Sequence, residues 1–342
     1  MRVELAQEED LGRWQAFVDE HPSAGPFHHS GWFHVLSDCF SVQPSFLQAV
    51  DEDNTLLGVL PAYFSSSLLA GKHLTTMEQG ALCRDRQVEE ALYAEAIKVR
   101  DAKNGGYLLL RGCADGLVTG LQVRVPKVRT IVPISDDKEQ TWKKLTSNTR
   151  RKIRKAGKNG FFTEQDNNKI ADFYDIYAQN MRHLGTPVMT RRMMLSIQRH
   201  LANKMRLYTV RYQGIVVGGS LCILSSSTLS SLYVAISREI LPLYPTYLLY
   251  WSLIEGASQS GVARLDLGRS VPESGTHKFK QQWGGIDVYM NYTYCYKMAS
   301  HPKGRLLDTG ADKTFKQRIW SSFPLAITNS LGPMLRRQLP FL

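Results

Sequence analysis

The chain carries the same order of strand-like and helix-like segments twice, and this repetition limits the folds that it can adopt. In the first half, FLQAVDEDNTLLGVLPAYF predicts a strand, an acidic turn and a strand, and NGGYLLLRG predicts a later glycine-led strand. In the second half, MRLYTVRYQGIVVGGSLCIL and SGVARLDLGRS repeat this pattern. Gly58 corresponds to Gly218 and Gly106 to Gly261, at a spacing of about 155 to 160 residues. That spacing is too long for a solenoid repeat and indicates a duplicated domain.

Helical periodicity fills the intervals between these strands in the same way in both halves. The predicted helices are 7–20, 30–39 and 88–103 in the first half, and 170–182, 190–202 and 247–260 in the second. The resulting order, helix, helix, strands, helix, strand, helix, strand, predicts an α/β fold whose mixed sheet has helices on both faces. This is the order of the GNAT (acyl-CoA N-acyltransferase) fold, twice.

The segment that joins the halves, SDDKEQTWKKLTSNTRRKIRKAGKNG, predicts one basic connecting helix that ends at its glycines. Arg150, Arg151 and Arg154 lie in a run that has no acidic residue, and they are candidate anion-binding residues. A solvated helix face and a surface for phosphates both explain this run. The predicted domains are residues 1–137 and 161–300, with the connecting helix at 138–160 and a basic amphipathic tail at 301–342.

Charge and cysteine usage narrow the choice of partner and compartment. The 342 residues carry a net charge of +11, which favours an anionic partner such as nucleic acid, a nucleotide-activated precursor or an acidic membrane surface. The five cysteines are scattered and form no CxxC pair, as expected for reduced core thiols in the cytoplasm. The acidic start, MRVELAQEED, does not resemble a secretory signal, and we expect no membrane-spanning segment.

The stretch LDLGRSVPESGTHKFKQQWGG contains the residues that point most directly to chemistry. It predicts a short buried strand, an irregular loop and a helix that begins at Thr276. Phe279 and Trp283, four residues apart, share one face of that helix. Lys280 is therefore expected to point away from this aromatic pair, toward the carboxyl end of the strand. We expect it to lie beside a cleft and to contribute little to packing and stability.

Four stretches resemble the FemAB family, a tandem-GNAT group that includes the aminoacyl-tRNA-dependent ligases of peptidoglycan cross-bridges. They are HPSAGPFHHSGWFHVL, SNTRRKIRKAGKNG, FYDIYAQNMRHLGTP and the Lys280 stretch, and they span most of residues 20–296. The last two are more similar to FemAB-like proteins that accompany exosortase (PEP-CTERM) and exopolysaccharide systems. The resemblance implies amide-forming acyl transfer, with either aminoacyl-tRNA or acyl-CoA as donor and no bound cofactor.

Two departures from these families bear on the acyl donor. The long helical arm of the FemA-type ligases is absent, which weakens the argument for aminoacyl-tRNA. The segment SREILPLYPTYLLY lacks the glycine-rich turn on which acyl-CoA enzymes hold pyrophosphate, which weakens the argument for CoA. Both donors stay open.

The resemblance also implies site residues. The pair Phe279–Lys280 matches a Phe-Lys pair that is implicated in acyl transfer, with the lysine stabilising the oxyanion. The substrate-binding candidates are Arg269, Asp266, His277, Tyr233, Tyr247, Trp32 and His29. A solvated lysine, an Asp266–Arg269 ion pair and packed aromatic rings are the alternative interpretations. No residue spacing indicates a metal site.

The tail from His301 to Leu342 has seven basic and two acidic residues interleaved with bulky apolar ones. This composition favours contact with an acidic membrane surface, and packing against the second domain is the alternative.

The sequence thus predicts a cytoplasmic, monomeric acyltransferase that joins an activated acyl group to a substrate amine. Its partners would be an anionic donor, tRNA or a CoA thioester, and a precursor of the cell envelope, peptidoglycan or an exopolysaccharide. Peripheral contact with the inner face of the inner membrane is a further expectation. The alternatives are an acyl-CoA-dependent N-acetyltransferase that acts on an amino sugar, and a non-catalytic membrane-associated scaffold with the same fold.

Overall fold

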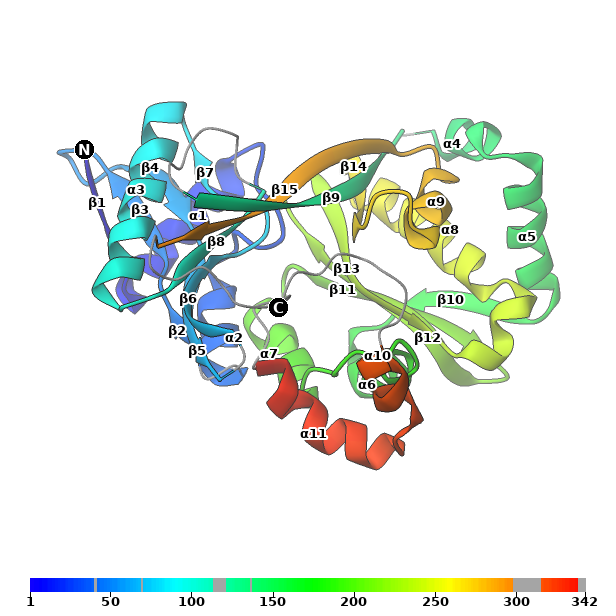
Figure 1. The fold of residues 1–342 in the computed structure, drawn as a ribbon. Helices are drawn as coiled ribbons and strands as arrows, with labels where there is room; N and C mark the ends of the chain where they lie inside the picture. Colours follow the sequence, from blue (N-terminus) through cyan, green and yellow to red (C-terminus); the bar gives the residue numbers. More distant parts are fainter. Residues whose placement is uncertain (40–41, 69, 113–120, 136, 298–314, 338–342) are drawn as a thin grey trace. The chain divides into compact units, whose positions relative to one another are not determined.

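The computed structural model describes residues 1–39, 42–68, 70–112, 121–135, 137–297 and 315–337. The chain divides into two units by its internal contacts (Figure 1). Unit 1 takes its described residues from Met1–Lys127, Tyr289–Thr309 and Leu335–Leu342, and unit 2 takes them from Val128–Val288 and Gly310–Met334. The predictions made for residues 301–314 and 338–342 and for Cys113 concern positions outside the described residues.

Unit 1 contains a four-stranded sheet of order β1-β3-β4-β7 and a run of strands of order β15-β8-β6-β5-β2. Its strands are β1 (Arg2–Leu5), β2 (Gln43–Pro44), β3 (Leu47–Val50), β4 (Leu56–Leu60), β5 (Ala62–Ser67), β6 (Gly71–Thr76), β7 (Leu82–Cys83) and β8 (Tyr107–Arg111). Its helices are α1 (Leu11–Glu20), α2 (Gly31–Cys39) and α3 (Arg86–Ala102), with a 3-10 turn at Glu8–Asp10. Asp85 caps α3 by accepting the N–H of Val88.

Unit 2 contains a run of strands of order β10-β11-β12-β13-β14-β9. Its strands are β10 (Phe161–Gln165), β11 (Met205–Tyr212), β12 (Ile215–Leu224), β13 (Thr228–Ile236) and β14 (Arg264–Ser270). Its helices are α4 (Lys138–Lys144), α5 (Ser147–Lys158), α6 (Ile170–His183), α7 (Arg191–His200), α8 (Pro245–Gln259), α9 (Gly275–Gln281) and α10 (Phe315–Ser322). Helix α11 (Leu325–Arg337) lies in unit 2 as far as Met334. Short 3-10 turns precede α6 at Asn167–Lys169 and α8 at Arg238–Leu243, the latter termed η3. Helix α6 packs on one face of the sheet, and α8 with α5 on the other (Figure 1).

Two long strands each complete the sheet of the opposite half of the chain. Strand β9 (Leu121–Pro133) follows the first half in sequence and pairs in unit 2, and β15 (Ile286–Tyr296) follows the second half and pairs in unit 1. In unit 2, β13 and β14 are parallel, and the end of β9 pairs antiparallel with β14. In unit 1, β6 and β8 are parallel, and the end of β15 pairs antiparallel with β8. The same strand pattern is therefore built twice, each time closed by a strand from the other half of the chain.

Two of the glycines that mark the repeat, Gly58 and Gly218, allow neighbouring strands to approach closely. A Cβ at Gly58 would lie 2.8 Å from Cys83 Cβ on β7, and a Cβ at Gly218 would lie 2.8 Å from the Ala235 carbonyl oxygen on β13. Either side chain would displace a strand of the sheet. Gly58 and Gly218 thus have the same structural reason in the two halves, whereas Gly261 has open space around it and a φ of +66°.

The predicted connecting helix is two helices. Helix α4 ends at Lys144, Leu145 has extended backbone, and the Thr146 hydroxyl caps α5 by accepting the N–H of Thr149. Both helices belong to unit 2. Residues 128–137 likewise lie in unit 2 rather than with the first half, and β15 from Tyr289 lies in unit 1, so this division crosses the predicted boundaries at 137 and 300.

The core of unit 2 lies between the sheet and helices α5 and α8, and it includes Leu265, Leu267 and Trp283. Cys39, Cys222 and Cys295 are buried and Cys83 is half-buried, all four as free thiols. Within the described residues, no helix combines the length and the apolar character needed to cross a bilayer.

Candidate functional site

The regular pairing of the parallel strands β13 and β14 ends after three positions, at the carboxyl edge of the sheet of unit 2. Thr228–Ser230 pair with Arg264–Asp266, after which no pairing follows. The register of β14 against β9 shifts between Asp266 and Arg269, and Gly268 has φ +75°. A Cβ at Gly268 would lie 2.9 Å from the Ser231 carbonyl oxygen. The bulge therefore turns backbone carbonyl groups of β14 out of the sheet.

Lys280 places its ammonium on this bulge. Its Nζ donates to the carbonyl oxygens of Gly268 at 2.8 Å and Arg269 at 3.0 Å. The predicted direction of the side chain, toward the strand's carboxyl end, agrees with these bonds. The lysine is far more closely packed than expected, because Lys280 is only 5% exposed. Burial lowers its pKa to about 8, against a raising effect of Asp266 and with a further lowering effect of Arg269.

The helix that carries Lys280 begins earlier than predicted. Ser274, and not Thr276, is the N-cap of α9, and its hydroxyl accepts the N–H of His277. Glu273, just before it, has φ +61°. The shift of two residues leaves Phe279, Lys280 and Trp283 on the helix or at its end as predicted.

Asp266 is the buried carboxylate of the site, and its main partner comes from β9. It is 3% exposed, and the Arg129 guanidinium donates to its Oδ2 from Nε and Nη2. Its Oδ1 accepts the N–H of Gly268 at 2.8 Å, which fixes the bulge. The alternation of β14 turns Asp266 to the face opposite Leu265 and Leu267, which is the face of α6. Sequence reasoning paired Asp266 with Arg269 and missed Arg129.

A buried ammonium and a buried carboxylate lie close together at this end of β14. Lys280 and Asp266 are almost fully buried, and Arg129 pairs with Asp266. In a site of low dielectric, the Lys280 ammonium can stabilise a developing oxyanion.

His277 is held in place from both sides of its ring. Its Nδ1 accepts the N–H of Glu273 at 3.1 Å, and its Nε2 donates to Asp287 Oδ2 at 2.9 Å. The ring is 0% exposed. Although partial burial raises the pKa of Asp287, hydrogen bonds from Gln281, His277 and Thr130 bring it below the usual value. These contacts assign His277 to fixing the loop before α9.

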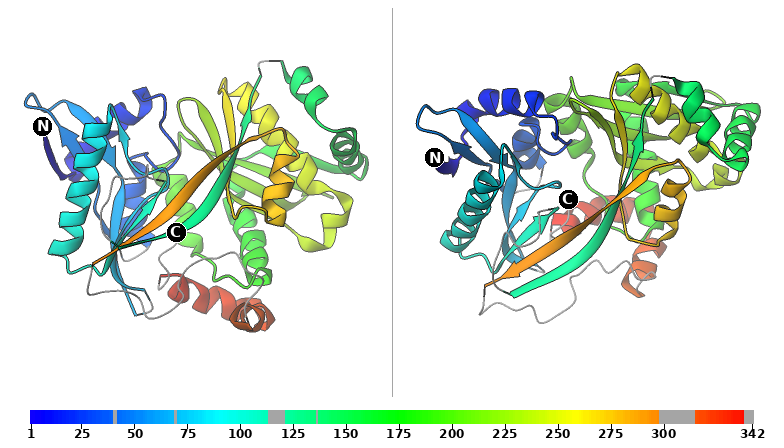
Figure 2. Two further views of the ribbon diagram at one scale, coloured as in Figure 1. Left: turned by 45° about the horizontal axis from the view of Figure 1, so that its top comes forward. Right: turned by 90° about the horizontal axis from the view of Figure 1, so that it is seen from above.

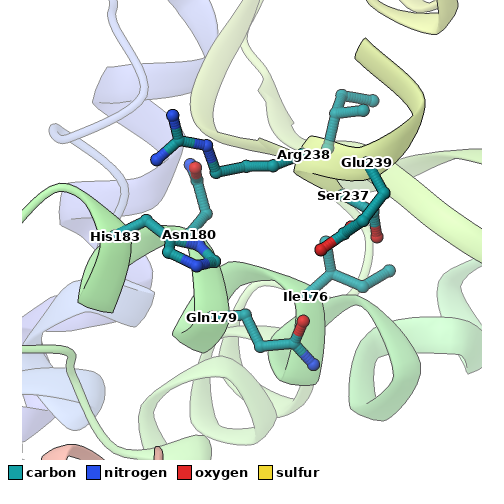
Figure 3. Close-up of a pocket in the computed structure, with 8 residues that line it drawn as sticks. Ile176, Gln179, Asn180, His183, Ser237, Arg238 and Glu239 are labelled. Atoms are coloured by element: carbon teal, nitrogen blue, oxygen red, sulfur yellow. The ribbon is translucent and has the colours of Figure 1, made fainter. Parts of the chain in front are cut away.

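Tyr233 and a shallow pocket lie on the α6 face of the sheet. The Tyr233 ring contacts the Tyr177 ring of α6, with centroids 5.7 Å apart. Beyond the end of β13, Figure 3 shows the pocket, with the side chains of α6 facing those of Ser237, Arg238 and Glu239. Its lining residues are Ile176, Gln179, Asn180, His183, Ile236, Ser237, Arg238 and Glu239. Sequence reasoning did not find this pocket, because its two walls are about sixty positions apart in the chain.

The aromatic residues near Lys280 in sequence lie on the α8 face of the sheet. Phe279 is half-buried, and its ring meets those of Tyr247 at 5.3 Å and Tyr250 at 5.0 Å. Trp283 is 2% exposed and stacks on Tyr250. Tyr247 therefore lies in the aromatic cluster on the α8 face, whereas Tyr233 lies on the α6 face.

Basic residues of α5 reach the start of α8. Lys152 Nζ donates to the Tyr247 hydroxyl at 2.8 Å, and Lys155 Nζ lies 5.4 Å from the Tyr244 ring centroid. Tyr244, the N-cap of α8, has φ +69° and makes no side-chain cap bond. The first turn of α8 is thus bordered by two ammonium groups.

The three arginines predicted to bind anions differ in their contacts. Arg150 Nη1 donates to the carbonyl oxygens of Lys143 and Leu145 and so caps the end of α4. Arg151 donates to Asn148 Oδ1, and Arg154 lies over the Trp142 ring; both are exposed.

His29 and Trp32 lie in unit 1 and are both buried. His29 Nδ1 is 3.0 Å from Gln15 Nε2, and Trp32 Nε1 donates to the Pro26 carbonyl oxygen at 2.8 Å. These contacts pack α1 and α2 together. Among the described residues of both units, no three His, Cys, Asp or Glu side chains form a group able to hold a metal ion.

Comparisons with known proteins agree with this architecture. Residues 143–281 match the family described as "Acetyltransferase (GNAT) domain". This match covers α5 to α9 and includes Lys280. No curated protein sequence matches the chain.

Solved structures match almost the whole chain. The structure titled "Crystal structure of FemX" matches with a TM-score of 0.66 at 16% identity, over 85% of this chain and 97% of that one. "The structure of L-PGS from Bacillus licheniformis" matches with a TM-score of 0.56 at 12% identity, over 87% and 94%. A "Tandem GNAT protein from the clavulanic acid biosynthesis pathway (without AcCoA)" matches with 0.53 at 10% identity, over 86% and 98%. The chain has a mixed α/β, tandem GNAT acyltransferase fold.

Proposed function

We propose that the bulged end of β14 in unit 2 is the site of an amide-forming acyl transfer, in which Lys280 stabilises the oxyanion. The buried position of Lys280 carries this proposal. An ammonium has three N–H donors, and the two bonds to Gly268 and Arg269 leave one for an incoming oxygen. A hydrogen-bond donor that is already fixed in a buried site needs no reorganisation when charge develops in the transition state.

The reaction joins a substrate amine to the carbonyl carbon of an activated ester or thioester. The amine nitrogen forms the new bond, the carbonyl oxygen becomes the oxyanion beside Lys280, and collapse expels the alcohol or thiol of the donor with the proton that the amine loses. Arg129 and Asp266 hold the bulge, and Phe279 and Trp283 anchor the helix. The pocket between α6 and the residues after β13 offers amide, hydroxyl and charged groups suited to a polar acceptor.

The donor phosphates would lie at the start of α8, beside Lys152, Lys155 and the exposed face of α5. Backbone N–H groups of a helix start, together with ammonium groups, are suited to phosphate. This chemistry serves either aminoacyl-tRNA or acyl-CoA. Thermal-shift titration with CoA and filter binding of tRNA separate these two donors. We expect Lys152→Gln with Lys155→Gln to weaken the binding of the true donor, whereas Lys72→Gln with Lys98→Gln, on exposed residues of unit 1, should not.

Aminoacyl transfer in cell-envelope assembly is the preferred assignment. It is supported by the resemblance of the Lys280 stretch to the FemAB family and by the fold shared with FemX and L-PGS. An exopolysaccharide precursor in a PEP-CTERM system is the finer form of this proposal. An acyl-CoA-dependent N-acetyltransferase is the second candidate, favoured by the matching GNAT family and by the tandem GNAT structure whose title mentions AcCoA.

Single-turnover amide formation tests the role of Lys280. Aminoacyl-tRNA and acetyl-CoA are each supplied with amine-bearing envelope precursors and amino sugars, and the product is identified by mass. Lys280→Met should lower the rate with the productive acyl donor by about a hundred to a thousandfold, which is the usual effect of removing one hydrogen-bond donor to an oxyanion. Lys278→Met, on an exposed residue of the same helix, is the matched control. A fully active Lys280→Met protein would remove the lysine from the mechanism.

A further inference from the structure

Helix α11 has its polar side turned inward and its apolar side turned outward. The residues of α11 that face unit 2 include Thr328, Asn329 and Gly332, which are buried or half-buried. The residues that face solvent include Ile327, at 40% exposure, and Leu331, at 45%. A surface helix of a globular protein normally shows the opposite arrangement. The outward face is therefore built for something other than water.

Exposed apolar residues also occur on α10 and in the turn before α11. Together with those of α11 they are Ile319 (42%), Phe323 (39%), Ile327 (40%), Leu331 (45%) and Met334 (64%). We call these five residues the outward stripe. On α11, the spacing of three or four positions gathers Ile327, Leu331 and Met334 along one side of the helix.

The two helices are fixed to unit 2, so the outward stripe is a defined surface. Gly185, after α6, lies so close to Gln317 of α10 that a Cβ there would be 2.7 Å from the Gln317 Cβ. A Cβ at Gly332 of α11 would lie 3.0 Å from the Val188 backbone nitrogen. Figure 2 shows α10 and α11, in red, beside the green helices of the same unit. Trp320 is 8% exposed and anchors α10 from the inside.

The charge of this segment favours an anionic occupant. Residues 315–337 contain four basic residues and no acidic residue, and Arg318 among them is exposed. A second folded protein would have to match both the apolar side chains and this net charge. The surface of an anionic bilayer meets both at once, because acyl chains take apolar side chains and anionic headgroups attract a segment of net positive charge.

We propose that α10 and α11 form a peripheral docking surface for anionic membranes, with the outward stripe inserted at the headgroup boundary. This inference goes beyond the proposed function and does not depend on acyl transfer. It differs from the expectation for the tail as a whole, since the same helices both pack on unit 2 and present the stripe.

Sedimentation of the full chain with lipid vesicles tests the proposal. Vesicles containing phosphatidylglycerol are compared with pure phosphatidylcholine vesicles, at low and high salt. The triple variant Ile327→Ser, Leu331→Ser, Met334→Ser should reduce binding to the anionic vesicles at least about tenfold, because three apolar anchors are lost. The matched control, Leu195→Ser with Ile215→Ser and Ile286→Ser, changes three equally exposed apolar residues of unit 2 and should bind as the parent does. Thermal melts of both variants confirm that the fold is kept.

Three results would overturn the proposal. Equal sedimentation of the parent and the triple variant would show that the stripe does not contact lipid. Equal binding of the parent to both kinds of vesicle would remove the charge selection. A parent that ignores vesicles but forms a dimer that the triple variant loses, measured by light scattering, would assign the stripe to a second copy of the chain.

Discussion

At the scale of single residues, Lys280 is the group whose titration should be visible in activity. Oxyanion stabilisation needs the protonated ammonium, and burial has lowered its pKa to about 8. The attacking amine must lose its own proton, and it does so equally in the parent and in Lys280→Met. The single-turnover rate of the parent divided by that of Lys280→Met therefore isolates the contribution of the lysine, and this ratio should fall as the pH rises through about 8. A ratio that stays constant across this range would contradict the role of the charge.

The same pKa predicts a pH dependence of stability with a defined sign. The ordinary lysine pKa is 10.5 and the folded value is about 8, so the unfolded chain binds more protons between these values. The unfolding free energy of the parent, relative to that of Lys280→Met, should therefore rise with pH across this window. Urea titrations at several pH values measure this difference. A difference that falls with pH would mean that the lysine is not buried.

Removing the Lys280 side chain should also destabilise the protein, contrary to the expectation from sequence. Lys280→Ala leaves two buried carbonyl groups without their donor, and a lost partner of this kind costs about 1 to 3 kcal/mol. The sequence indicated the direction of Lys280, since helical spacing fixes it relative to Phe279 and Trp283. The sequence did not indicate its burial, because that depends on the bulge in β14 and on Arg129, which is 137 positions from Asp266.

At the scale of elements, the aromatic anchors of α9 differ in how deeply they are buried. Trp283 is 2% exposed, whereas the Phe279 ring is only half-buried. Trp283→Ala should lower the unfolding free energy by about 3 to 5 kcal/mol, and Phe279→Ala by less. Denaturant unfolding of the two variants gives the order directly. If Phe279→Ala proved the more damaging change, the packing of α9 on α8 would have to be different.

The connecting segment shows where periodicity stops being informative. Trp142, Leu145, Ile153 and Ala156 follow helical spacing, and this spacing predicts one helix. The structure breaks the helix because the Thr146 hydroxyl caps a new start and Arg150 satisfies the carbonyl groups that α4 leaves open. A threonine inside a run of helical spacing is a weak signal, and the arginine contact depends on the turn that it stabilises.

At the scale of the whole molecule, the duplication was visible in the sequence and the exchange of strands was not. Glycine spacing and hairpin patterns locate the repeated strands, because those signals are local. Strand β14 pairs on one side with β9, which precedes α4 and α5 in the sequence. Nothing in the alternation of VPKVRTIVP says which sheet it joins, and so the predicted boundary at residue 137 separates β9 from the half whose sheet it completes.

This exchange predicts which fragments of the second half can fold. A fragment of residues 128–334 keeps the end of β9, with Val128 and Val132 buried against the core and Arg129 paired with Asp266. A fragment of residues 138–334 loses all three and leaves a buried carboxylate without its cation, which alone costs about 3 to 5 kcal/mol. The longer fragment should melt cooperatively by circular dichroism, and the shorter one should not. Arg129→Met in the longer fragment separates the ion pair from the strand, since it keeps the β9 pairing and should still melt cooperatively, at a lower temperature than the unchanged longer fragment. Equal cooperative melting of the two fragments would mean that β9 is dispensable to the sheet that carries Lys280.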